Sequence, residues 1–242
     1  MAEYISFQPS DFFSTKLYTG TGAELANTGV GFQPDLIWNK ERSGTEGQNW
    51  TDAVRGATKY VMSNNNDGQS TNAESVKSFD SDGFTLGTFD GMNTDTETYV
   101  AWNWKAGTTT GLTGGTITPT SYSINTTSGV GIYQYTGNEV SGANIAHGLG
   151  VIPQMIIVKR TQTTGDWMVY HEFNGNGKYL SLNGSAAAAT STSAWNDTSP
   201  TSTLFYLGDG SYVNADSSTY IAYAFAPING YSKFGTYSGN GN

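Results

Sequence analysis

The acidic residues best spaced to act as a catalytic pair lie in SFDSDGF, where Asp80 and Asp82 flank a turn. Two carboxylates on either side of a glycosidic bond hydrolyse polysaccharides, so this pair is where such an activity would be sought. Acidic residues this close together beside glycine are more typical of turns, or of a loose calcium site. We expect Asp80 and Asp82 to shape a turn, with structural calcium and hydrolysis as the alternatives.

Other catalytic chemistry has little to build on. The chain has no cysteine, which excludes thiol chemistry, disulfides and cysteine-containing zinc sites. Its two histidines, His147 in AHGLG and His171 in WMVYHEF, are expected to pack in a loop and on a strand. The glycine-rich stretches GTGAEL and GLTGG lack the lysine of a phosphate-binding loop. We therefore expect no enzymatic activity, catalytic residue, metal site or cofactor.

Tryptophan is the residue type that most suggests ligand binding, because its flat face stacks on sugar rings and tolerates partial exposure. Trp50 and Trp167 follow polar loops, and Trp195, in SAWNDTS, is expected to be the most exposed. These three are the candidate ligand-binding residues, and anchoring of a loop on the core is the alternative for each. The other three tryptophans lie in apolar segments and are expected in the core: Trp38, Trp102 and Trp104.

Asp52 and Arg55 carry opposite charges three residues apart in TDAVRG. We expect them to pair on the surface, where an ion pair stabilises weakly. The alternative is that they hold a ligand.

Composition excludes several classes of partner. The formal net charge is −9, with 11 Lys and Arg against 20 Asp and Glu, which argues against a nucleic-acid surface. No stretch approaches the roughly 18 consecutive apolar residues of a membrane span. The first residues, MAEYISFQPS, lack the basic and apolar regions of a secretory signal. We expect neither nucleic-acid binding nor membrane insertion.

An internal repeat decides the organisation of the chain. Segments recur in the same order at offsets of 117 to 121 residues, and Trp50 matches Trp167 at the same spacing. The matched segments are YTG (18–20 and 135–137), GVGFQPDLIWNK with GLGVIPQMIIVK (29–40 and 148–159), KYVMSN with KYLSLN (59–64 and 178–183), FTLG with FYLG (84–87 and 205–208), and TYVAWNW with TYIAYAF (98–104 and 219–225). The chain therefore contains two copies of one module.

The repeated segments have the character of short strands, rich in β-branched and aromatic residues and bounded by Gly, Asn, Asp and Pro. The predicted fold class is all-β, with two tandem homologous, jelly-roll-like β-sandwich modules. The first module with its N-terminal arm spans residues 1–106, a Gly/Thr/Ser-rich linker spans 107–130, and the second module spans 131–242. One extended strand is expected within the linker, around Ser121–Asn125. The final GYSKFGTYSGNGN resembles the opening of a module, so its strand either completes the second sheet or, as we expect, opens a third repeat.

The motifs also resemble those of a known group of proteins. GVGFQPDLIWNK, SFDSDGFTLG, TYVAWNWKAG, AHGLGVIPQMIIVKR, WNDTSPTSTLFYLG and GYSKFGTYSGNG are similar to repeat modules in virion proteins of marine tailed bacteriophages, including cyanophages. The resemblance covers nearly the whole chain. It implies a non-enzymatic protein of the virion, often a tail fibre or other surface protein, and it implies no catalytic residues.

The leading hypothesis is a tail-fibre or tail-associated protein for host recognition and adhesion. Its expected partners are other virion proteins, a host surface glycan or protein, and further copies of itself, most simply as a trimer. One alternative is a capsid decoration or head-fibre protein, anchored to the virion by an aromatic N-terminal stretch that could instead form a strand of the first module: Tyr4, Phe7, Phe12 and Phe13. The remaining alternative is a polysaccharide depolymerase.

Overall fold

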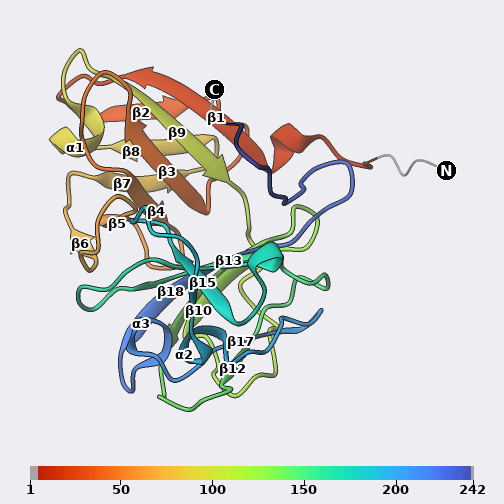
Figure 1. Ribbon diagram of the computed structural model, residues 1–242. Coiled ribbons are helices and arrows are strands. Elements are labelled where there is room, and N and C mark those ends of the chain that lie inside the picture. Colours follow the sequence, from red (N-terminus) through yellow and green to blue (C-terminus); the bar gives the residue numbers. More distant parts are fainter. Residues whose placement is uncertain (1–4, 241–242) are drawn as a thin grey trace.

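A computed structural model describes residues 5–240 of the chain. Its regular structure is mostly β-strand in antiparallel sheets, with only short helices between the strands (Figure 1). The fold is therefore all-β, as the sequence predicts. No helix in the described part of the chain is long and apolar enough to cross a membrane.

The first half of the molecule, residues 5–106, contains one large and one small sheet. The large sheet has the strand order β1 (Phe13–Thr19), β9 (Thr98–Trp104), β3 (Leu36–Glu41), β4 (Asn49–Asp52), β5 (Lys59–Met62) and β6 (Ser70–Thr71). The small sheet has the order β2 (Leu25–Thr28), β8 (Gly83–Leu86) and β7 (Val76–Asp80). The helical turns of this half are η1 (Pro9–Asp11) and α1 (Asp90–Asn93).

The second half, residues 107–240, is built in the same way. Its large sheet has the order β10 (Ser121–Asn125), β11 (Val130–Thr136), β18 (Thr219–Phe225), β13 (Met155–Arg160), β14 (Met168–His171), β15 (Lys178–Ser181) and β16 (Ala189–Thr190). The small sheet pairs β12 (Asn144–Ala146) with β17 (Leu204–Tyr206). The helical turns are η2 (Glu172–Asn174), α2 (Thr192–Trp195) and α3 (Ser211–Asn214).

The strand order β1-β9-β3-β4-β5-β6 of the first half recurs in the second as β11-β18-β13-β14-β15-β16. Matched residues also make matched contacts. Tyr18 stacks on Tyr99 with ring centroids 5.1 Å apart, and Tyr135 stacks on Tyr220 at 5.2 Å. The main difference in the large sheets is β10, which has no counterpart beside β1 among the described residues.

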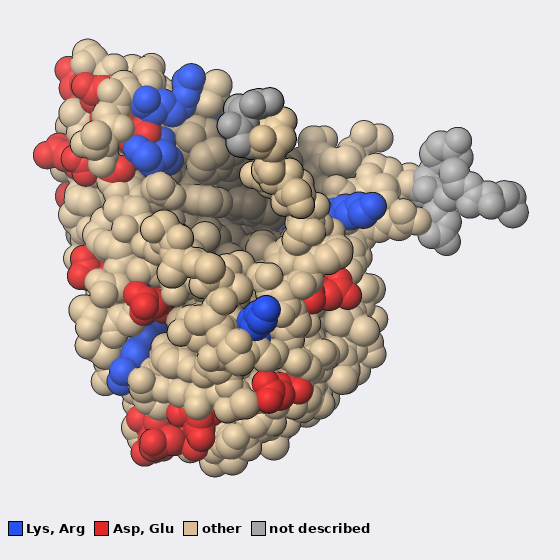
Figure 2. Space-filling model, viewed as in Figure 1, with Lys and Arg blue, Asp and Glu red and all other residues tan. Residues whose placement is uncertain are grey.

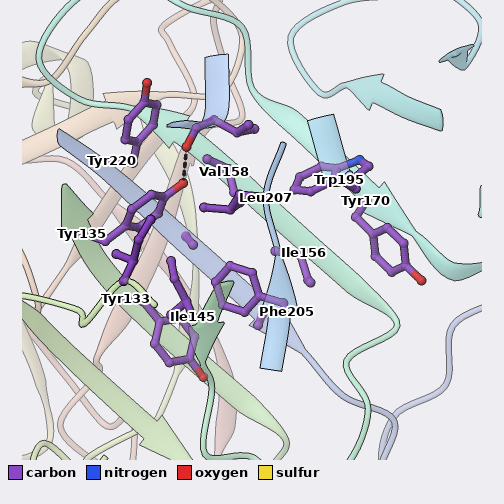
Figure 3. Close-up of a cluster of buried hydrophobic side chains, with 14 of the residues drawn as sticks. Tyr133, Tyr135, Ile145, Ile156, Val158, Tyr170, Trp195, Phe205, Leu207 and Tyr220 are labelled. Carbon is purple, nitrogen blue, oxygen red and sulfur yellow. Dashed lines mark hydrogen bonds between the residues drawn. The ribbon is translucent and has the colours of Figure 1, made fainter. Parts of the chain in front are cut away.

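Each half has its own apolar core between its large and small sheets. In the first half this core includes Ile37, Phe84 and Leu86. Figure 3 shows the second core, where Tyr135 donates a hydrogen bond from its hydroxyl to the backbone oxygen of Val213 at 2.6 Å. Alternating side chains on each strand therefore supply one face to this core and leave the opposite face for another contact.

That opposite face joins the halves. A third apolar cluster combines residues of the first large sheet with residues of the second, including Trp50 and Val61 from one and Ile157, Trp167 and Tyr223 from the other. The two large sheets thus pack against each other through the faces that point away from their own cores.

The segment between the halves carries the strand predicted around Ser121–Asn125, which is β10, whereas the C-terminal segment differs from the predicted strand. Residues 107–129 lie against the second half, where β10 pairs with β11 and Ile117 is buried. The predicted C-terminal strand is not formed, since residues 233–240 have no regular structure. A strand needs a hydrogen-bonded neighbour, and no described strand pairs with this segment.

Candidate functional site

The junction between the two large sheets is closed along one side by buried polar groups. Arg55 pairs with Asp52 through its Nε, 2.6 Å from Oδ2, and both side chains are almost fully buried. From the second half, the hydroxyl of Tyr223 donates to the same Asp52 oxygen at 2.8 Å. Burial by itself lowers the pKa of Arg55, but the neighbouring Asp52 and Tyr223 raise it overall, so the guanidinium stays charged.

The prediction of a surface pair is therefore wrong. Asp52 ends β4 on the face that packs against the second half, and Arg55 follows in the next turn. Arg55 also donates through an Nη atom to the backbone oxygen of Trp50 at 2.9 Å. A buried charge needs such a full set of partners, because an unpaired one is strongly unfavourable.

A second set of polar contacts closes the same side. Lys159 in β13 is fully buried, and its Nζ donates to the backbone oxygens of Gly165 at 2.7 Å and of Asn66, in the first half, at 3.1 Å. Burial lowers the pKa of Lys159 to about 8. The indole Nε1 of Trp167 donates to the backbone oxygen of Met62 at 2.9 Å, which adds another bond between the halves.

Backbone groups complete this closure. The amide of Gly165 donates to the oxygen of Asn66 at 2.8 Å, and the amide of Gln69 donates to the oxygen of Thr161 at 2.7 Å. The loop after β5 therefore lies directly on the loop after β13. We call this polar edge of the junction the closed side.

The opposite edge of the junction is open and forms an apolar cleft of about 500 Å³. Figure 2 shows a hollow between the two halves, with an uncharged wall in this view. The cleft is lined by Phe13, Trp38, Trp50, Trp104, Ser128, Gly129, Val130, Met155, Ile157, Leu182, Phe225, Ala226, Tyr231, Ser232 and Phe234.

The chemistry of the cleft is that of a binding site for an apolar group. None of the described residues that line it is charged. Its volume falls within the range of about 300–1,000 Å³ that is usual for ligand sites. Trp38 and Trp104 are only half-buried, so their rings are available to a partner. The cleft can bind and desolvate an apolar ligand or side chain, and its lining supplies no carboxylate or imidazole for acid–base chemistry.

A family model for a domain of unknown function, DUF7483, matches residues 8–242 of the chain. The chain belongs to the DUF7483 family. No curated protein and no solved structure matches it. The matched range includes both halves of this DUF7483 chain and the whole of the cleft.

The three tryptophans predicted to bind ligand are separated by the DUF7483 fold. Trp50 is 2% exposed and lies at the bottom of the junction, where it contributes to the lining of the cleft. Trp167 is fully buried on the closed side. Trp195 was expected to be the most exposed, but this is wrong: it is 1% exposed in α2, where it packs against Tyr170 in the core of the second half.

Trp38 and Trp104, expected in the core, are instead the half-buried tryptophans of the cleft. The signal for this was present in the strand periodicity. Trp38 is opposite Trp102 in the register of β3 and β9, and Trp104 lies two residues further along β9, so all three share one face of the sheet. A sheet face this rich in tryptophan indicates a contact surface, but only the packing of the halves shows which part stays open.

The aromatic residues of the N-terminal arm lie in two places. Phe13 begins β1 and lines the cleft. Phe7 packs edge-on against Phe12 at 5.1 Å and against Tyr231 at 5.5 Å, so this part of the arm lies on the C-terminal segment of its own chain. Tyr4 lies outside the described residues.

Asp80 and Asp82, the candidate catalytic pair, accept hydrogen bonds around a turn, as expected. Asp82 accepts backbone hydrogen bonds from Gly29 at 2.9 Å and Gly31 at 2.7 Å, which lower the pKa of its carboxyl group. Asp80 accepts from the hydroxyls of Ser78 and Thr85, each at 2.7 Å. Asp82 thus fixes the loop after β2 on the turn between β7 and β8, and Asp80 braces the β7–β8 hairpin.

The two histidines are likewise engaged with backbone groups. His147 is fully buried, with its Nδ1 accepting from the amide of Leu149 at 3.1 Å and its Nε2 at 3.0 Å from the oxygen of Thr201. Burial lowers the pKa of His147, which favours the neutral ring with its proton on Nε2. Among the described residues, no group of three or more histidine or acidic side chains is arranged to hold a metal ion.

Proposed function

We propose that this protein is a non-enzymatic structural and adhesive component of a virion, in which two β-sandwich modules in tandem form a stiff unit that binds a partner in the cleft between them. The sequence resemblance to repeat modules of bacteriophage virion proteins supports the location. The repeated strand order supports the duplicated module.

The observation that carries the binding role is the open side of the junction. The sheets are held together on the closed side, so the cleft is a preformed feature and not a gap between freely moving parts. Little conformational entropy is lost when a partner binds to a preformed site, which favours affinity. Most of the favourable binding free energy would therefore come from burying apolar surface of the partner.

The same chemistry favours a protein partner over a glycan. Sugars stack on aromatic rings, but their hydroxyl groups also need hydrogen-bonding partners. The lining offers Ser128, Ser232 and Tyr231 as hydroxyl side chains and no carboxylate or amide side chain. We propose that the partner presents one or two aromatic or aliphatic side chains to Trp38 and Trp104.

A location on the tail fits the N-terminal arm better than attachment to the capsid by that arm. Phe7 and Phe12 pack on each other and on Tyr231 of the same chain. An anchor made from them would have to leave these contacts first. This favours the tail-fibre hypothesis over the capsid decoration hypothesis.

The experiment combines location and binding. Gold-labelled antibody against the protein is expected to mark the tails of intact particles, and labelling confined to the capsid shell would reject a tail protein. Purified wild-type protein is expected to compete with particles for adsorption to the host. The double variant Trp38→Ser/Trp104→Ser should lose this competition, whereas Val140→Ser, at an exposed apolar residue outside the cleft, should retain it.

A further inference from the structure

Two aromatic residues that follow β18 line the cleft but are held there in different ways. Tyr231 and Phe234 contribute rings to the lining, whereas the rest of its apolar surface comes from strands of the two large sheets or from residues next to them. Figure 1 shows this part of the chain leaving the second half and running toward the first. The way in which each ring is held decides which part of the cleft wall is fixed.

Tyr231 lies in a hydrogen-bonded turn. Its amide donates to the backbone oxygen of Ile228 at 2.9 Å, and the amide of Ser232 donates to the same oxygen at 2.9 Å. The hydroxyl of Ser232 donates to the oxygen of Ala226, the residue after β18, at 3.2 Å. The ring of Phe7 packs on that of Tyr231 at 5.5 Å. The chain is therefore fixed as far as Ser232, and Tyr231 is a fixed part of the wall.

Phe234 is held by its side chain. It is half-buried and packs against the apolar cluster that joins the two large sheets. Its neighbours Lys233 and Gly235 are exposed, and a Cβ built on Gly235 would have nothing within 4 Å. Within the part of the chain that the structure describes, residues 233–239 make no backbone hydrogen bond. The ring of Phe234 thus attaches this stretch to the cleft.

Two opposing contributions set how firmly the Phe234 ring is docked. Burying part of the ring is favourable in proportion to the apolar area removed from water. Docking also orders residues 233–235, which lose backbone freedom without gaining a backbone hydrogen bond in return. The docked form of Phe234 is therefore favoured only weakly, in contrast with the hydrogen-bonded Tyr231.

We propose that Phe234 is a displaceable cap on the cleft, which covers part of its apolar wall in the free protein and leaves when a partner binds. This proposal rests on the binding role proposed for the cleft. An aromatic or aliphatic side chain of a partner has the same chemistry as the Phe234 ring, so both can cover the same apolar surface beside Trp38 and Trp104. The chain thus carries its own competitor, which reduces the apolar surface exposed in the free protein.

A cap lowers the apparent affinity of the cleft and leaves its other walls unchanged. When a site is open in only a fraction of the molecules, the apparent Kd is the intrinsic Kd divided by that fraction. Removing the Phe234 ring should then tighten binding. If Phe234 were a fixed wall, its removal would take away surface that the partner buries and would weaken binding. The sign of the effect separates the two roles.

The test uses the whole chain with Nile red as the apolar probe. Phe234→Ser removes the cap and Tyr231→Ser removes the fixed aromatic wall. Tyr237→Ser is the control, because Tyr237 is 94% exposed and does not line the cleft. Fluorescence titration gives the Kd of each protein, and thermal unfolding checks that each variant is folded. Phe234→Ser should bind about three- to tenfold more tightly than the wild type, Tyr231→Ser more weakly, and Tyr237→Ser equally.

A second measurement follows the ring itself. A fluorinated phenylalanine in place of Phe234 reports the surroundings of the ring by fluorine NMR. In the free protein its resonance should differ from that of the urea-unfolded chain, because the ring lies among the aromatic residues of the cleft. Saturation with Nile red should move the resonance toward the unfolded position.

The outcomes distinguish the cap from the cleft. Unchanged or weaker binding by Phe234→Ser, or a fluorine resonance that stays at its docked position when Nile red is bound, would overturn the cap and leave the cleft as a binding site. Absence of Nile red binding by the wild type and by Phe234→Ser alike would reject the binding role of the cleft, and the cap with it.

Discussion

The two sides of the junction between the halves differ in chemistry although they join the same pair of sheets. The closed side contains buried charges and hydrogen bonds, with Arg55, Asp52 and Lys159 at its centre. The open side is lined by uncharged, largely aromatic residues. The comparison shows that a few polar residues fix how the sheets meet and thereby leave a cleft elsewhere.

The repeat makes this asymmetry easier to trace. Counterpart residues meet across the junction at Trp104 and Phe225, whose ring centroids lie 6.4 Å apart. Trp50 and Trp167 also meet, at 5.4 Å, but the strand registers match Trp50 with Val169. Contacts between equivalent positions are typical of packing around a two-fold axis. In the strand registers Asp52, opposite Leu36, matches His171, opposite Met155. At the closed side the halves thus differ at Asp52, whereas Lys159 matches Lys40 and both copies carry lysine there.

The largest effect is expected from breaking the buried ion pair. Arg55→Ala leaves Asp52 buried without its charge partner and should lower the free energy of unfolding by about 3–5 kcal/mol. Lys77→Ala is the matched control, because the Lys77–Glu24 pair is the other ion pair in the described residues and is solvent-exposed. Its removal should change stability little. Urea unfolding measures both, and equal losses would contradict a special role for the closed side.

A smaller effect is expected from the tryptophans on the two sides. Trp167→Phe removes the bond to the oxygen of Met62 and some buried area, and should cost about 2 kcal/mol. Trp38→Phe, in the open cleft, should cost less than about 1 kcal/mol because the ring is half-exposed. If the cleft tryptophan proved the more costly to replace, the assignment of closed and open sides would be wrong.

The smallest effect is a pH dependence from Lys159. Its pKa is about 8 in the folded protein and close to the ordinary value of 10.5 when unfolded. Between these values the unfolded state binds more protons, so the free energy of unfolding should rise with pH, by at most about 1.4 kcal/mol per pH unit. Below pH 8 this contribution is flat.

Lys159→Met should remove this rise, and Lys40→Met, at the matching position of the first half, should keep it. Unfolding measured between about pH 7 and 8.5 keeps the ionisation of each tyrosine in the unfolded chain to about 3% or less. A wild-type stability that falls over this range, or a rise that persists in Lys159→Met, would contradict buried neutralisation of Lys159.

Strand positions were largely predictable, because short β-branched and aromatic segments bounded by turn residues leave few alternatives. The junction between the halves could not be predicted. The alternation of residues along a strand such as β9 shows that both its faces are apolar, but it does not show which part of the protein covers each face. Trp195 was misplaced since its polar neighbours suggested a surface loop, whereas α2 turns its ring into the core. Burial of Asp52 and Arg55 followed from a long-range contact with Tyr223, 168 residues beyond Arg55, that no local pattern encodes.

The most direct test of the open cleft is titration with an uncharged apolar dye such as Nile red, followed by its fluorescence. The account predicts saturable binding to one site on the wild type, loss of binding in Trp38→Ser/Trp104→Ser, and retention in Val140→Ser. Absence of saturable binding to the wild type, or an equal loss in Val140→Ser, would contradict it.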